Sequence, residues 1–102
     1  MHAIYSIDEI KTKLEPIFKT EPIYKAVLFG SYAKGCATEN SDVDIAIDSR
    51  GHLENWGLYG VLHDISETLV KSVDLLEMSQ IRFNTSLLYE IEEKGVLLYE
   101  RQ

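Results

Sequence analysis

The stretch FGSYAKGCATENSDVDIAI, residues 29–47, decides how the rest of this chain is interpreted. It joins two apolar runs: Gly30 and Ser31 end the first, and an Asp-x-Asp sequence with Asp42 and Asp44 opens the second. Side chains of a strand point alternately to its two faces. The apolar residues of the second run are therefore expected to face the core, while the two aspartates share the opposite face.

The rest of the sequence predicts an alternation of helices and strands. Ser6 and Glu9 form a capping-box pattern at a helix start, and Pro16 is expected to kink or end that helix. Further helices are predicted around residues 58–69 and at 85–94, and strands at residues 23–29, 42–48, 72–78 and 96–99. The 102 residues, 45% of them hydrophobic, suit a single domain, residues 1–102, of the α/β class (α+β type).

Composition excludes several classes of partner and compartment. The formal net charge of -7 disfavours direct binding of a polynucleotide, because that affinity comes mainly from Lys and Arg neutralising phosphates. Cys36 is the only cysteine, so no intrachain disulfide is possible. The N-terminal residues lack a signal-peptide pattern, and no apolar run approaches the roughly 20 residues of a membrane span. We therefore expect a cytoplasmic protein without a membrane anchor.

A third carboxylate, Asp74, is predicted in the strand at residues 72–78, on the face opposite Val73 and Leu75. Two unit charges about 4 Å apart repel by roughly 4 kcal/mol at an effective dielectric of 20. Mg²⁺ reverses this cost, since it binds one or two protein carboxylates and leaves positions for water and substrate phosphates. The alternative is that Asp42, Asp44 and Asp74 are ordinary solvent-facing residues, which is the better interpretation for an isolated Asp-x-Asp.

Gly30 and Ser31 change that balance. Glycine lets the backbone approach a ligand closely, and a helical turn that starts there offers unpaired N–H groups to phosphate oxygens. Taken alone, the pair is more simply a tight turn. Together with three aspartates, it predicts a phosphate site facing a metal site.

With these residues in place, the chain resembles the minimal nucleotidyltransferases of the DNA polymerase β superfamily. Their pattern is Gly-Ser, ten residues and Asp-x-Asp, which stands here as Gly30-Ser31 followed by Asp42-Val43-Asp44. Asp74 falls in the later strand, where the family carries its third carboxylate. The sequence departs from many relatives at Tyr32 and Lys34, where they have Arg; Lys34 can supply a point charge without the bidentate geometry of arginine.

The resemblance implies a polymerase β-like fold, a small mixed β-sheet flanked by helices. It further implies transfer of AMP from ATP to a hydroxyl with two Mg²⁺ ions. Asp42, Asp44 and Asp74 would be the catalytic, metal-binding residues, and Gly30, Ser31 and Lys34 would bind the nucleotide. Small members of this family often resemble the antitoxin whose partner is an all-helical HEPN ribonuclease toxin, with a tyrosine of that toxin as the acceptor.

Two other functions stay open at this level: a non-catalytic subunit that neutralises a partner, and a small-molecule transferase of the aminoglycoside type. Trp56 and Tyr59 are interpreted as helix packing, with base stacking or partner binding as alternatives. Three glutamates of the last helix are expected to form a solvated face: Glu90, Glu92 and Glu93.

Overall fold

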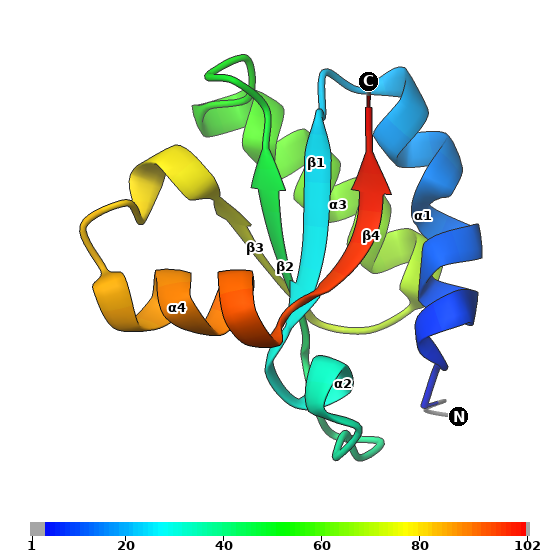
Figure 1. Ribbon diagram of the computed structural model, residues 1–102. Coiled ribbons are helices and arrows are strands. Elements are labelled where there is room, and N and C mark those ends of the chain that lie inside the picture. Colours follow the sequence, from blue (N-terminus) through cyan, green and yellow to red (C-terminus); the bar gives the residue numbers. More distant parts are fainter. Residues whose placement is uncertain (1–3, 102) are drawn as a thin grey trace.

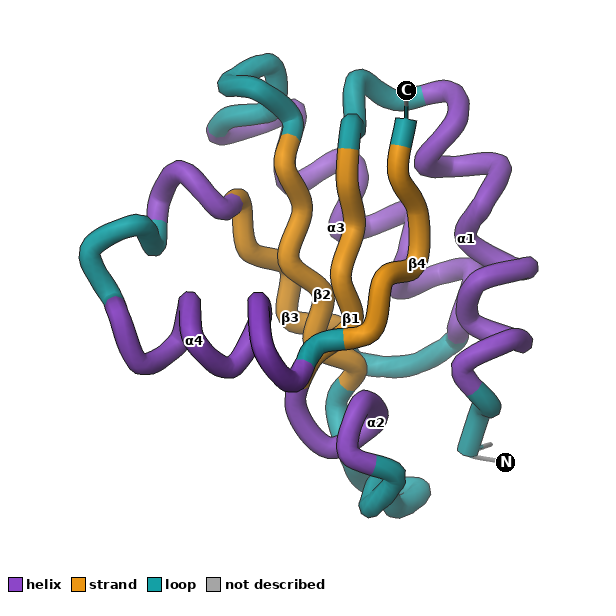
Figure 2. The backbone as a smooth tube through the Cα atoms, in the orientation of Figure 1, coloured by secondary structure: helices purple, strands orange, loops and turns teal. Residues whose placement is uncertain are grey.

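The computed structural model describes residues 4–101 and arranges four strands in one mixed sheet. The elements follow the chain as α1 (Ile7–Thr20), β1 (Lys25–Phe29), α2 (Gly30–Lys34), β2 (Val43–Asp48), α3 (Asn55–Leu69), β3 (Val73–Glu77), the short 3-10 helix η1 (Met78–Gln80), α4 (Thr85–Lys94) and β4 (Val96–Glu100). Their order in the sheet is β3-β2-β1-β4 (Figure 2). This confirms the predicted fold class, a small mixed sheet flanked by helices.

Two apolar layers cover the two faces of the sheet. In Figure 1, α3 lies behind the sheet and α1 lies beside β4 at the right; residues of both helices, among them Phe18 and Ile65, join Ile45 in the larger core cluster. The helix α4 crosses the other face and packs Ile91 against Val27 and Ala46. Only part of this second face is covered, and α2 with the start of β2 lies at its lower end in Figure 1. No helix of the described residues is long and apolar enough to cross a bilayer.

Strand pairing brings the second and third strands together in parallel. β1 runs antiparallel to both β2 and β4, whereas β2 and β3 are parallel, with Asp44 opposite Asp74. A parallel pair needs a crossover connection, which α3 supplies between β2 and β3. The sequence predicted the strands to within about two residues at their ends, the usual uncertainty of such boundaries.

The first helix differs from the expectation at Pro16. Its start is confirmed, because the Ser6 hydroxyl accepts from the Glu9 N–H (3.0 Å) and the Glu9 carboxylate accepts from the Ser6 N–H (2.9 Å). The expected early end at Pro16 is wrong, since α1 continues to Thr20. Pro16 lies on the exposed side of the helix, where water can solvate the carbonyl that loses its partner. The helix ends instead before Pro22, which disfavours helical backbone at the preceding residue.

Candidate active site

Gly30 stands where β1 passes into α2, and its lack of a side chain makes room for Asp44. Its φ of +73° lies in the left-handed region. A Cβ added there would overlap Oδ2 of Asp44 and come within 3.1 Å of its Cγ. The pattern Gly-Ser…Asp-x-Asp is therefore a packing relation in this structure: the backbone of the Gly-Ser turn lies directly against the second aspartate of the motif.

Asp44 and Asp74 occupy facing positions on β2 and β3. The pKa of Asp44 is raised to about 6, chiefly by burial and further by a hydrogen bond with Asp74 and by the charges of Asp74, Asp42 and Glu90. Asp42 lies just before β2, and both it and Asp74 are exposed to solvent. The three carboxylates are thus neighbours around the half-buried Asp44, and their mutual repulsion disfavours its ionised form.

The donor chemistry at this site fits a divalent cation. Mg²⁺ uses one or two protein carboxylates, and Asp44 with Asp74 offers an adjacent pair. Within residues 4–101, no group of three His, Cys, Asp or Glu side chains is arranged to hold an ion. The Asp44–Asp74 pair meets the need for one or two ligands, with the other coordination positions left to water and substrate oxygens.

The two residues that depart from the family's arginines have different environments. The Tyr32 ring is buried in the core (4% exposed), so it cannot reach a nucleotide. Its hydroxyl has no hydrogen-bond partner among the described residues. Lys34, at the end of α2, keeps its ammonium group at the surface and forms an ion pair with Glu90 of α4, with 3.0 Å between Nζ and Oε1. Lys34 is therefore the cation that α2 offers beside the carboxylates.

Glu90 was expected on a solvated face, and this is wrong for Glu90 alone. Its carboxylate pairs with Lys34 and its charge acts on Asp44, whereas Glu92 and Glu93 are exposed. The helix spacing held no signal for this, because Glu90 and Glu92 both lie next to the buried Ile91. The position of Lys34 in the folded chain distinguishes Glu90.

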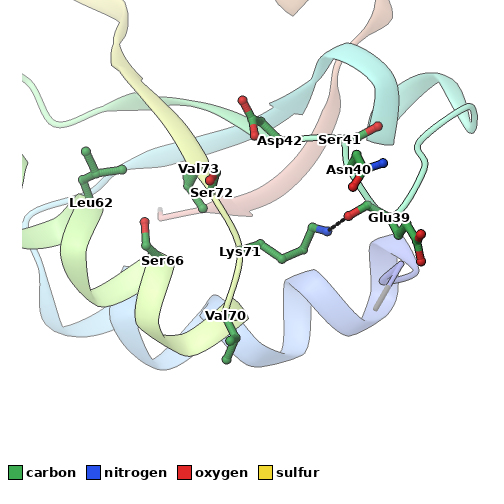
Figure 3. Close-up of a pocket in the computed structure, with 10 residues that line it drawn as sticks. All are labelled: Glu39, Asn40, Ser41, Asp42, Leu62, Ser66, Val70, Lys71, Ser72 and Val73. Atoms are coloured by element: carbon green, nitrogen blue, oxygen red, sulfur yellow. Dashed lines mark hydrogen bonds between the residues drawn. The ribbon is translucent and has the colours of Figure 1, made fainter. Parts of the chain in front are cut away.

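A pocket of about 630 Å³ opens beside Asp42, between the end of α3 and the segment at residues 39–42 (Figure 3). Lys71 crosses its floor and donates from Nζ to the Glu39 carbonyl (3.0 Å), as the dashed line in Figure 3 marks. Gly30, Asp44 and Asp74 do not line this pocket. It therefore adjoins the carboxylate group through Asp42.

The expectation for Trp56 and Tyr59 also changes. Both lie on α3, but they do not pack in the core: 86% of Trp56 and 64% of Tyr59 are exposed. Their rings lie near each other, with centroids 6.1 Å apart. Interpreting them as helix packing was wrong, and the alternative of a binding role stays open.

Comparison with known proteins places this geometry in context. The family model described as "Polymerase beta, Nucleotidyltransferase" matches residues 12–102. A protein of Methanocaldococcus jannaschii, provisionally named a protein adenylyltransferase, is 34% identical over 76 residues, which are 74% of this chain and 82% of that protein. The protein adenylyltransferase MntA of Shewanella oneidensis is 31% identical over 93 residues, 91% of this chain and 63% of MntA.

A solved structure shares the fold. The crystal structure of a toxin–antitoxin complex with AMP-PNP contains a chain that superposes with a TM-score of 0.78 and 26% identity, covering 90% of this chain and 74% of that one. The resemblance that the motif spacing indicated is confirmed by these matches.

Proposed function

Because this chain belongs to the polymerase beta nucleotidyltransferase family, we propose that it transfers AMP from ATP to a protein hydroxyl as the antitoxin of a toxin–antitoxin pair. The acceptor is a tyrosine of a HEPN-domain toxin, and residues 1–102 act as a single nucleotidyltransferase domain. The observation that carries the proposal is the fit of Gly30 against Asp44, opposite Asp74. The name of the matched protein adenylyltransferase MntA supports a protein acceptor, and the matched toxin–antitoxin complex supports a partner of that kind.

The reaction forms one bond and breaks one. The acceptor oxygen bonds to the α-phosphorus of ATP, the bond from that phosphorus to the oxygen bridging to the β-phosphorus breaks, and pyrophosphate leaves. Asp42 and Asp44 are the residues that would hold the nucleotide-bound Mg²⁺, and Asp74 would hold a second ion with them. When bound, two divalent ions neutralise charge on the attacking and leaving oxygens.

Other residues of the chain bind the phosphates and help to remove the hydroxyl proton. Gly30 and Ser31 present backbone N–H groups and a hydroxyl to the β and γ phosphates, and Lys34 supplies a positive charge beside them. Lys34 is paired with Glu90, so binding of triphosphate exchanges one anionic partner of the ammonium group for another. Asp74, exposed on the edge strand β3, is a carboxylate that an acceptor arriving from solvent can reach, and it takes part in removing the hydroxyl proton.

The test uses Mg²⁺ and α-labelled ATP, with the chain alone and with the product of the adjacent reading frame. Wild-type protein is expected to label that partner, and Asp74→Asn is expected to retain ATP binding but lose transfer, because neutral Asn can neither hold the second cation nor accept a proton. Transfer by Asp74→Asn at the wild-type rate would refute the role of Asp74. A wild-type protein that labels nothing favours the non-catalytic subunit, and label on an added aminoglycoside alone favours the small-molecule transferase.

A further inference from the structure

Glu90 of α4 lies near the part of the sheet that carries the candidate aspartates. Ile91, the next residue along α4, belongs to the same apolar cluster as Ala46 of β2. Asp44 shares the sheet face of Ala46, because side chains two positions apart on a strand point the same way. The pKa of Asp44 is raised chiefly by burial, and the charge of Glu90 is among the nearby charges that raise it further. Glu90 is therefore a fourth carboxylate at this site, and the Gly-Ser…Asp-x-Asp motif does not include it.

The Glu90 carboxylate is paired with the cation that α2 offers to a triphosphate. The helices α2 and α4 contact each other at the lower end of the sheet in Figure 1. There, Oε1 of Glu90 lies 3.0 Å from Nζ of Lys34, and the two side chains are 30% and 49% exposed. A lysine ammonium group is a compact charge with three N–H donors. Glu90 therefore occupies one of these donors and offsets part of the charge that attracts phosphate.

Glu90 opposes the binding of a triphosphate in two ways. Phosphate oxygens must replace or share Glu90 at the Lys34 ammonium group, so the ion pair is weakened when they bind. The Glu90 carboxylate also repels the phosphate charges directly, and a half-buried carboxylate is screened less by water and salt than a fully exposed one. Both effects have the same sign, since each lowers the affinity of the site for polyphosphate.

We propose that Glu90 is a built-in competitor of the triphosphate: it pairs with Lys34 when no nucleotide is bound, is displaced by ATP and pairs with Lys34 again as pyrophosphate leaves. The inference rests on the proposed function, since it concerns the phosphates of that reaction. Pyrophosphate carries away the β and γ phosphates that Lys34 attracts, so the exchange that weakens ATP binding also speeds product release. Because Glu90 acts through Lys34, it is a positioning residue and not a catalytic one.

The test compares Glu90→Gln with Glu92→Gln by calorimetry, using Mg²⁺-ATP and Mg²⁺-pyrophosphate as probes at saturating Mg²⁺ without a partner protein. Each substitution removes one negative charge from α4 and keeps the shape of the side chain. Glu92 is the matched control, because it is exposed and lies about 200° further round the helix. Glu90→Gln is expected to bind both probes about fivefold more tightly than wild type, the equivalent of about 1 kcal/mol and the upper end for an exposed ion pair. Glu92→Gln is expected to bind them as wild type does.

Two further measurements show whether the gain passes through Lys34. In Lys34→Gln protein, adding Glu90→Gln is expected to tighten Mg²⁺-ATP binding less than twofold, because the ion pair is already absent there. In steady-state transfer of AMP to the product of the adjacent reading frame, Glu90→Gln is expected to lower the KM for ATP without raising kcat. Pyrophosphate is expected to inhibit this variant at lower concentrations than it inhibits wild type.

The outcomes separate this inference from the proposed reaction. Unchanged binding of both probes by Glu90→Gln overturns the competitor role, and weaker binding overturns it by showing that Glu90 holds Lys34 in position for the phosphates. A gain of equal size in Glu92→Gln also overturns it, because the effect would then come from net charge alone. Tighter binding in Glu90→Gln, with a wild-type chain that transfers no AMP, supports the competitor role and overturns the reaction. A wild-type chain that binds neither probe overturns both.

Discussion

Replacing Gly30 with alanine is expected to have two separate effects: a slower AMP transfer, because Asp44 is displaced, and a lower stability, because the turn is strained. The added Cβ would overlap Oδ2 of Asp44 and come within 3.1 Å of its Cγ, so the carboxylate must leave its position. A displacement of about 1 Å in a reacting group can cost about a hundredfold in rate. The same substitution puts alanine in left-handed backbone, which costs about 1 kcal/mol of folding free energy.

Gly35 provides the matched control, because it has the same backbone conformation without the contact. Its φ is +75°, and an added Cβ would meet nothing within 4 Å. Gly35→Ala is therefore expected to lose about 1 kcal/mol of folding free energy, the same backbone cost as in Gly30→Ala. Its rate of AMP transfer is expected to stay at the wild-type value.

The assay is initial-rate transfer of α-labelled AMP to the partner at saturating ATP, with urea unfolding of each variant alongside. Gly30→Ala is expected to be about a hundredfold slower than Gly35→Ala while both remain folded under assay conditions. Equal rates in the two variants would refute the reasoning, because they would show that Asp44 does not need the space that Gly30 leaves.

Three further predictions concern stability and nucleotide binding. In metal-free protein the folded Asp44 carboxyl keeps its proton up to its pKa of about 6, whereas the unfolded carboxyl releases it near 3.8. The free energy of unfolding should therefore fall as pH rises through this window, by at most about 3 kcal/mol and by less because Asp44 is partly exposed. Asp44→Asn should remove this pH dependence in urea titrations from pH 4 to 7. Glu77 is buried (1% exposed) and accepts from the backbone N–H groups of Ser49 (2.9 Å) and Ser79 (3.0 Å); Glu77→Ala should cost about 3 kcal/mol in the free energy of unfolding, and a loss no larger than that of the exposed Glu92→Ala would contradict this role. Ser31→Ala should weaken Mg²⁺-ATP binding by about 1 kcal/mol in calorimetry, and an unchanged affinity would count against its contact with phosphate.

The sequence determined the features that depend on neighbours along the chain. The start of α1 follows from the Ser6–Glu9 capping box, and α4 begins at Thr85 and ends at Lys94 as its spacing predicted, because caps and helical periodicity act over a few residues. The distance along the chain from Gly30-Ser31 to Asp42-Val43-Asp44 was enough to indicate the family.

The tertiary structure decided which residues meet across the sheet. Asp74 stands opposite Asp44 because α3 returns the chain so that β3 pairs in parallel with β2, an arrangement that the residues near Asp74 do not specify by themselves. Glu90 reaches Lys34 only because α4 crosses the same face of the sheet, 56 positions along the chain from that lysine. Likewise, Tyr32 is buried and Trp56 exposed although both are aromatic residues in helices. A local pattern shows which side chains a helix offers, but the elements packed around it decide which of them reach the core, the site or the solvent, since burial is a property of the assembled layers.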